Sequence, residues 1–584
     1  MREVRKIGIV GIGPRGGYAL EKLILELAER NSLVDIHLSL YESTGNFGNG
    51  QVYDLNQNSS NWINISERIL ELGQRKAIEY KNLKIPSFPS YHEWVNKDFN
   101  TLSNNTIDSY PPRKVLGEYL SQRFQSLTKP LIQFNIISLH KELVTHVKLL
   151  INNKVLITTN SNSHAEYSEV LLTVGHQSTE PSQQISNWNQ FADKNEHLKL
   201  FKSPYPTYDY LNHENLIDES VIGIRGFGLA MIDVVRAITE KLGQFSTLDH
   251  KTKLSTYNFE QKIEIKLVPF SLDGLPPAPK PLNARIDKWF EPTKASIIAF
   301  EKHIGNEITQ KKAESPQFLI EAFAPIAADI YLKLPNTKNP QNLSKTTIEN
   351  IIVRWLEDQE FRHSLIISTQ QSPEKSMERF ITMATGSAAI SLDYCIGQVW
   401  RHCQPYIYKN LSFNKCSDSV FAKIIQLDES TKRYSYGPPV ESIQQLLALA
   451  KMGILNLDMV NDPTIRLTKE GWRLEQSGKA ITANIMIDSV LDSPKIKSVS
   501  SPIVKNMLDD NLIRAVHDDL GVETDEYGFL ISNETFKHLP IALLGRLAKG
   551  TIIGVDAILE CFGSRPIQWA KQASNNHIDW LNKN

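Results

Sequence analysis

The residues best suited to chemistry in this sequence form a glycine turn close to the N-terminus. Gly11 suits a tight turn, Gly13 would let the backbone approach a pyrophosphate, and Gly16 would let a helix pack closely on a strand. Pro14 fits the first helical position, where its missing N–H costs nothing. Arg15 is unfavourable for the dipole of that helix and so suggests a bound anion. The turn predicts a phosphate-binding helix N-terminus.

The stretches on either side of this turn are those that a bound dinucleotide requires. An apolar run at 6–10 predicts a strand before the turn, and an amphipathic segment ending near Arg30 predicts a helix after it. A second strand-like run, 34–40, closes on Glu42, which is expected to bind ribose hydroxyls. Glu42 follows Gly16 by 26 residues, against about 20 in the usual fingerprint. The alternative is a turn in an unrelated fold, but the full context favours a dinucleotide-binding unit.

A second glycine turn lies near the middle of the chain. Strand-like residues 221–225 lead into Gly226 and Gly228, and the following run, 229–242, has a helical pattern. Met231 occupies the third glycine position of the fingerprint, where a bulky side chain would push helix and strand apart. Two interpretations therefore stay open: a second nucleotide site, and a Rossmann-type unit that no longer binds NAD(P) well.

Length and composition predict a globular protein with several domains. The chain has 584 residues, of which 41% are hydrophobic and 22% charged, and about 150 residues per domain suggests three or so domains. A formal net charge of −1 argues against binding to nucleic acid or a membrane surface. No apolar run is long enough to span a bilayer, and the strand so near the N-terminus leaves no room for a signal peptide.

The cysteines point to no redox or metal chemistry. No CxxC motif occurs among Cys395, Cys403, Cys416 and Cys561. We therefore expect reduced thiols in a cytoplasmic protein, with neither a redox disulfide nor a zinc site.

Further motifs extend to the C-terminal end of the chain. They are Tyr110-Pro111-Pro112-Arg113, Thr173-Val174-Gly175-His176 after an apolar strand, Tyr436-Gly437-Pro438-Pro439, and Gly545-Arg546 followed by Gly550-Thr551. With these motifs and its two glycine turns, the chain resembles the flavoprotein family of FAD/NAD(P)-binding proteins. The N-hydroxylating flavin monooxygenases that oxidise L-aspartate belong to the same broad group.

The resemblance implies FAD at the first glycine turn, with Glu42 on the adenosine ribose. Thr173 and Gly175 would lie beside FAD, and Gly545 would lie in a C-terminal loop near the ribityl chain of the flavin. The second turn, with Gly226 and Gly228, would take NAD(P)H, although Met231 departs from the pattern there.

The resemblance also implies a fold and a division into regions. The expected fold is α/β, with two Rossmann-like units and a mainly helical insert. The FAD domain would be built from both chain ends, because strand-like patterns return after about Pro463. The expected boundaries are 1–215 and 461–584 for the FAD domain, 216–285 for the second unit and 286–460 for the insert.

The leading functional interpretation is an NAD(P)H-dependent flavin monooxygenase. The flavin would carry the redox chemistry while the protein orients the reactants. The substrate would be a small nucleophile such as an amino-acid amine. Two alternatives stay open: a flavin oxidase or dehydrogenase that uses no pyridine nucleotide, and a non-catalytic FAD-binding protein whose helical insert serves a partner. Fold analogy cannot choose among them, and the oligomeric state is not indicated.

Three side chains are candidates for the site, and a structural interpretation of each stays open beside the functional one. Asn64 could hydrogen-bond flavin or substrate, or only cap its loop. Arg113 could pair with a substrate carboxylate, or form a structural salt bridge. His176 could act near the flavin or relay protons, or be a structural histidine. Lys280, within the proline-rich connector 275–281, is most simply a solvated charge.

Overall fold

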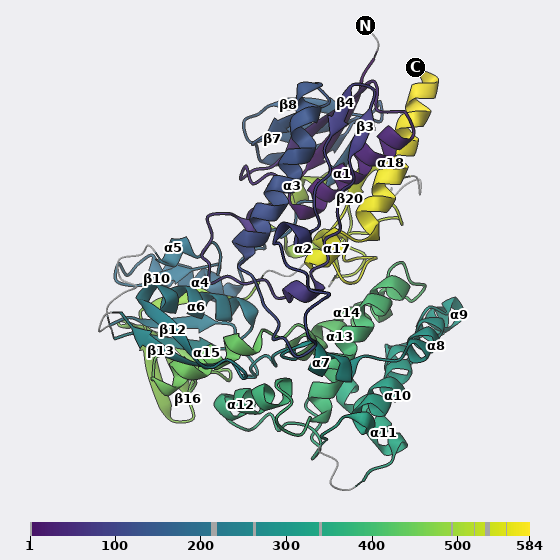
Figure 1. The fold of residues 1–584 in the computed structure, drawn as a ribbon. Coiled ribbons are helices and arrows are strands. Elements are labelled where there is room, and N and C mark those ends of the chain that lie inside the picture. The colour runs from purple at the N-terminus through teal and green to yellow at the C-terminus, as the bar shows by residue number, and fades with distance from the viewer. Residues whose placement is uncertain are drawn as a thin grey trace.

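A computed structural model describes residues 3–211, 219–260, 264–337, 342–491, 495–518, 520–531, 538–555 and 557–584. Figure 1 shows an α/β unit that contains both chain termini at the top, a second α/β unit at the left and a group of helices at the lower right. The mixed α/β class expected from the sequence is confirmed.

The first α/β unit is organised by a six-stranded sheet that uses both ends of the chain. Its strand order is β19-β20-β9-β1-β2-β5, and every neighbouring pair except β19–β20 is parallel. The strands are β1 (Arg5–Val10), β2 (Ile36–Tyr41), β5 (Ile137–His140), β9 (Glu169–Leu172), β19 (Phe529–Ile531) and β20 (His538–Leu543). Ile9 lies at the centre, opposite Leu40 of β2 and Leu171 of β9. The expected FAD-type fold built from both chain ends is therefore present.

Helices and smaller sheets complete this unit. Helix α1 packs against α18, the last helix of the chain, and its Leu20, Leu23 and Ile24 are fully buried, each stabilising the fold by roughly 1.5–3 kcal/mol. The helices are α1 (Pro14–Glu29), α2 (Tyr91–Trp94), α3 (Arg113–Gln133), α16 (Pro502–Asp509), α17 (Ile558–Cys561) and α18 (Ser564–Lys583). The added strands are β3 (Ile78–Tyr80), β4 (Leu83–Ile85), β6 (Val144–Leu149), β7 (Val155–Thr159) and β8 (His164–Tyr167).

The second α/β unit has a four-stranded, all-parallel sheet in the order β10-β18-β11-β14. Its strands are β10 (Lys199–Phe201), β11 (Val221–Arg225), β14 (Lys266–Phe270) and β18 (Ile485–Asp488). Strand β10 precedes residue 216 and β18 follows residue 461, so this sheet draws on three separate stretches of the chain. The expected boundaries at 215 and 461 therefore differ from the structure. Isolated three-residue and four-residue strands such as β10 and β18 carry too little pattern to reveal their sheet.

Smaller elements surround the second sheet. A hairpin of β12 (Gly243–Asp249) and β13 (Leu254–Phe259) follows helix α6 (Leu229–Leu242). A three-stranded antiparallel sheet comprises β15 (Thr464–Thr468), β16 (Gly471–Gln476) and β17 (Lys479–Ala483). Helices α4 (Gln183–Ala192) and α5 (Tyr208–Leu211) complete this part.

The insert is helical, as expected, and shares one core with the second unit. Buried residues of α6, such as Val234, belong to the same apolar cluster as Phe323 and Trp400 of the insert. Its helices are α7 (Ala284–Asp287), α8 (Lys294–Ile304), α9 (Glu307–Lys312), α10 (Gln317–Lys333), α11 (Lys345–Glu357), α12 (Pro373–Ala384), α13 (Leu392–Leu411), α14 (Asp418–Ser435) and α15 (Val440–Lys451). Because the core is continuous, the insert packs against the second unit and does not form a core of its own.

Three further observations concern the described residues only. None of their helices combines the length and apolar character needed to cross a membrane. Their histidines, cysteines and carboxylates form no group able to hold a metal ion. All four cysteines are free thiols, and burial raises the pKa of each.

Candidate functional site

The first glycine turn sits between β1 and α1, against the end of β9. Gly11 has φ +88°, and a Cβ on it would lie 2.5 Å from the carbonyl oxygen of Thr173. A Cβ on Gly16 would lie 2.3 Å from the carbonyl oxygen of Gly11. Side chains at these two positions would clash with backbone, so the turn requires glycine for the reasons that the fingerprint gives.

The surroundings of Gly13 differ from those of Gly11 and Gly16, because they leave room for a ligand. A Cβ there would meet only the Cα of Gly50, at 3.7 Å, so the protein alone tolerates a side chain at this position. Gly13 is also the N-cap of α1, and no side chain caps that end, where Pro14 is the first helical residue. Uncapped N–H groups and the positive end of the helix dipole suit a pyrophosphate.

A loop folds back over the same turn. The N–H of Gly48 donates to the carbonyl oxygen of Ile12 at 2.7 Å. Glu42, just after β2, is 8% exposed and accepts from the N–H of Ile12 at 3.0 Å and from the Thr44 hydroxyl at 2.9 Å. The Glu42 carboxylate is thus fixed at the strand end where a ribose lies in such folds, and it also holds the glycine turn and the loop together.

The C-terminal end of the chain reaches this turn through Arg15. Its guanidinium donates to the carbonyl oxygen of Val555 at 3.0 Å, and a Cβ on Gly545 would lie 2.4 Å from Arg15 Nη1. Gly545 has φ +103°. Arg15 therefore contacts this C-terminal loop, and its role toward a bound anion stays a prediction.

The Thr173–His176 motif continues from β9. The Thr173 hydroxyl donates to the carbonyl oxygen of Gly11, so it ties two strand ends together. Gly175 has φ +68° and lies in open space. His176 is exposed, and its Nε2 lies 3.5 Å from Nη1 of Arg546 in the C-terminal loop. The motif therefore joins β9 to the glycine turn on one side and to the C-terminal loop on the other.

Arg113 forms a salt bridge between the two α/β units. Its Nη2 lies 2.7 Å from Asp233 Oδ2 on α6, and the same carboxylate oxygen accepts from the Tyr205 hydroxyl. Burial alone would lower the pKa of Arg113, but Tyr205 and Asp233 outweigh it and raise the pKa. The structural alternative therefore describes the observed contacts, and a role of Arg113 toward a substrate carboxylate stays a prediction.

A second contact between the units was not anticipated from the sequence. The Arg236 guanidinium lies 3.3 Å from the centre of the Trp62 ring, and only 1% of Arg236 is exposed. Arg236 follows Asp233 by almost one helical turn on α6, so both side chains face the first unit. We name the set Trp62, Arg113, Tyr205, Asp233 and Arg236 the interdomain clasp.

The second glycine turn keeps the geometry of a nucleotide site. Gly226 has φ +117°, and a Cβ on it would lie 2.5 Å from the Ser489 hydroxyl oxygen. Gly228 caps α6 without a side-chain contact and faces open space. Met231 is fully buried in the shared core, and β11 still pairs along its whole length with β14. The Met231 side chain therefore packs into the core shared with the helical insert.

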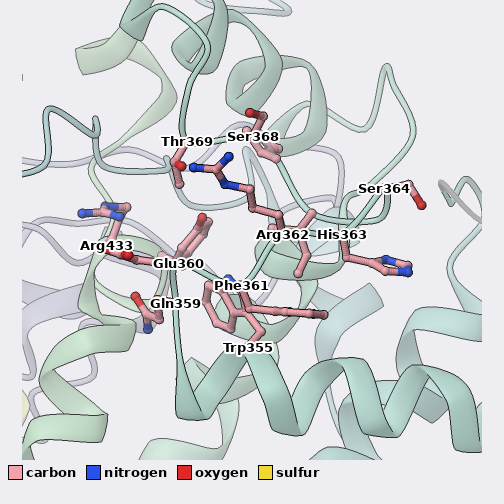
Figure 2. A pocket seen from close by; sticks show the side chains of 13 residues that line it. Trp355, Gln359, Glu360, Phe361, Arg362, His363, Ser364, Ser368, Thr369 and Arg433 are labelled. Carbon is pink, nitrogen blue, oxygen red and sulfur yellow. The ribbon is translucent and has the colours of Figure 1, made fainter.

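A cavity lies beside the loop that follows α11. It measures about 320 Å³ and is lined by the loop after α11 and by Arg433. Figure 2 shows the Arg362 side chain extending toward Thr369, with Arg433 to the left. Arg433 also forms an ion pair with Asp273, three residues after β14. In a Rossmann unit, an acidic residue beyond the second strand binds the adenosine ribose, and Asp273 follows β14, which pairs with β11.

Asn64 contacts the motif at 436–439 and the proline-rich connector. Its side-chain N–H donates to the carbonyl oxygen of Tyr436 at 2.7 Å, and its Oδ1 accepts from Lys280 Nζ at 3.1 Å. The three candidate residues contact different segments of the chain: Asn64 contacts Tyr436 and Lys280, Arg113 contacts Asp233, and His176 contacts Arg546. The expectation of a solvated Lys280 is wrong. The side chain is partly buried, and its amine donates to the backbone oxygen of Asn64 in the first unit. Its burial depends on contacts with residues more than 200 positions away, which no local pattern reveals.

The chain is similar to several solved structures and, over part of its length, to one family model. The chain resembles an FAD-bound crystal structure of OTEMO with 11% identity and a TM-score of 0.44, over 99% of this chain and 85% of the other. A cyclohexanone monooxygenase mutant from Rhodococcus sp. Phi1 bound to NADP+ gives 12% identity and a TM-score of 0.44, over 98% and 86% of the two chains. A search of curated proteins finds no match. Residues 8–177, which hold the first glycine turn, match the family model described as FAD-NAD(P)-binding.

Proposed function

We propose that this protein is an FAD-dependent monooxygenase that takes electrons from NADH or NADPH and N-hydroxylates a small amino-acid-like amine. FAD, when bound, supplies the redox chemistry and the reaction with oxygen. The chain's part is to hold the dinucleotides, orient them and exclude water.

One observation carries the proposal: two glycine-turn units are joined by a clasp that includes α6, the helix of the second turn. Gly13 and Gly228 are both uncapped helix N-termini with room beside them. Arg113 and Arg236 connect the first unit to α6 beyond Gly228. A pair of nucleotide sites on linked units suits hydride transfer from a pyridine nucleotide to a flavin.

The proposal is tested by the visible spectrum of the FAD-loaded protein under anaerobic conditions. We expect the bands of oxidised flavin to bleach on addition of NADPH or NADH. Oxygen should then restore the bands, with hydroxylated product when an accepted amine is present. Bleaching by an organic substrate without pyridine nucleotide would indicate an oxidase or dehydrogenase, and unchanged bands with every donor would contradict an enzymatic role.

The Asp273–Arg433 pair gives a prediction about coenzyme choice. In Arg433→Ser, the Asp273 carboxylate loses its cation and would repel a 2′-phosphate but not a 2′-hydroxyl. We expect the concentration of NADPH that half-saturates flavin reduction to rise at least 10-fold, about 1.4 kcal/mol, with NADH changing far less. Arg466→Ser, on an exposed edge of the small antiparallel sheet, is the matched charge control. Equal effects on both coenzymes would place the adenosine elsewhere.

A further inference from the structure

Lys280 lies in a connector that is clamped along its length. The N–H of Ala278 donates to the carbonyl oxygen of Arg433, and that of Lys280 donates to the carbonyl oxygen of Pro438, both at 3.0 Å. A Cβ on Gly437 would lie 1.6 Å from the carbonyl oxygen of Ala278, so only glycine lets the connector pass. The backbone at Lys280 is therefore fixed, and its side chain is directed toward Asn64.

The amine of Lys280 has an unusual set of partners. Its Nζ donates to the backbone oxygen of Asn64 at 2.5 Å and to Asn64 Oδ1 at 3.1 Å. No carboxylate lies within ion-pair distance of it among the described residues. The charged groups that face it are Arg401 on α13, which repels its positive form, and Asp287 on α7. Asp287 is already paired with Arg68 and Arg401 and accepts from His402.

These surroundings favour an uncharged amine. Burial, followed by repulsion from Arg401, lowers the pKa of Lys280 to about 7, against a smaller opposite effect of Asp287. A neutral amine has two hydrogens, and the two oxygens of Asn64 accept both. The lone pair is then left to take a proton, which is the arrangement of a general base that works near neutral pH.

We propose that Lys280 is the base that removes a proton from the ammonium group of the amine substrate, next to Asn64. An N–H bond of the substrate breaks, an N–H bond forms on Lys280 Nζ, and the electron pair stays on the substrate nitrogen. That nitrogen is then oxidised by oxygen, with NAD(P)H as reductant, in the reaction proposed above, on which this inference rests. The substrate class is a primary amine small enough to reach Lys280.

Substitutions of Lys280 separate a base from a charge that anchors a substrate carboxylate. Lys280→Met removes both the charge and the base, whereas Lys280→Arg keeps the charge but gives up no proton near neutral pH. If Lys280 acts as a base, both variants should lower product formation at pH 7.5 by about 100-fold or more. Flavin reduction by NAD(P)H should change by less than about 2-fold. The wild-type product rate should rise with pH through about 7, and both variants should lose that step. Rescue by Lys280→Arg would overturn the proposal.

A second measurement needs no substrate. The FAD-loaded protein is treated with formaldehyde and a borane reductant across a pH series, and methylation of each lysine is followed by mass spectrometry. Lys280 should reach half of its maximal labelling near pH 7. Lys409, which is 72% exposed and paired with Glu301, should do so at a much higher pH, because this pairing raises its pKa. A Lys280 midpoint above pH 9, or no labelling at any pH, would overturn the inference. Unchanged flavin bands with NAD(P)H would instead overturn the proposed function.

Discussion

Gly13→Ala is expected to lose FAD while keeping its fold. The new Cβ meets no protein atom closer than 3.7 Å, and the backbone of Gly13, with φ −83°, accepts any residue. The methyl group would instead occupy the approach path of the pyrophosphate. We expect FAD to bind at least 100-fold more weakly, about 2.7 kcal/mol, with an unchanged melting temperature of the FAD-free protein. Flavin fluorescence titration and thermal unfolding measure the two quantities.

The neighbouring glycines supply matched controls for this change. A Cβ on Gly17 would make ordinary contacts, the nearest at 3.5 Å from Phe124, so Gly17→Ala should keep FAD affinity. It should also raise stability slightly, because alanine favours helices over glycine. Gly16→Ala should lose stability as well as FAD, since its Cβ would lie 2.3 Å from backbone. Normal FAD affinity in Gly13→Ala would show that the pyrophosphate does not lie on this turn.

Asp233→Ala is expected to open the interdomain clasp. The Asp233 side chain is 8% exposed and that of Arg113 19%, so removal of the carboxylate leaves an almost buried guanidinium without its counter-charge. Loss of one partner of a buried pair costs about 3–5 kcal/mol. We expect faster hydrogen exchange in α6 and α3, and a fall in the unfolding free energy toward that range. Flavin reduction by NAD(P)H should slow as well, because the two units lose their fixed relation.

A double-mutant cycle distinguishes the clasp from general damage. Asp233→Ala combined with Arg113→Ala should cost less than the sum of the single changes, because the second loss removes the unpaired charge. Lys409→Ala, which breaks an exposed pair with Glu301, should cost less than about 1 kcal/mol. Additive effects of Asp233 and Arg113 would mean that their contact does not stabilise the junction.

Local features of the sequence were sufficient to predict the two glycine turns. Gly11 and Gly16 stand next to the strands and helix that need them, so spacing alone indicates their geometry. The fold built from both chain ends required the family resemblance, because nothing near Ile9 reveals that β20 joins the same sheet. Short β10 and β18 were assigned to the wrong unit for the same reason.

Side-chain partners were the least predictable part of the site. The contact of Arg15 with Val555, which lies 540 positions away, could not be predicted from the sequence. Lys280 looks solvated from its polar, proline-rich surroundings, yet burial and the nearby Arg401 lower its pKa. Met231 breaks the glycine fingerprint, but its side chain packs into a core that the helical insert helps to form. The sequence alone does not reveal how that insert packs. Burial is set by residues far apart in the chain, and a single sequence does not pair them.

The position of β20 beside β9 has a consequence for folding during synthesis on the ribosome. Strands β1 and β9 leave the ribosome more than 350 residues before β20 and α18 complete their layer. At 5–20 residues per second, the unfinished edge waits on the order of a minute or less. During that interval the edge of β9 and the apolar face of α1 are exposed to other chains. Translation speed and chaperone supply should therefore affect the yield of this protein.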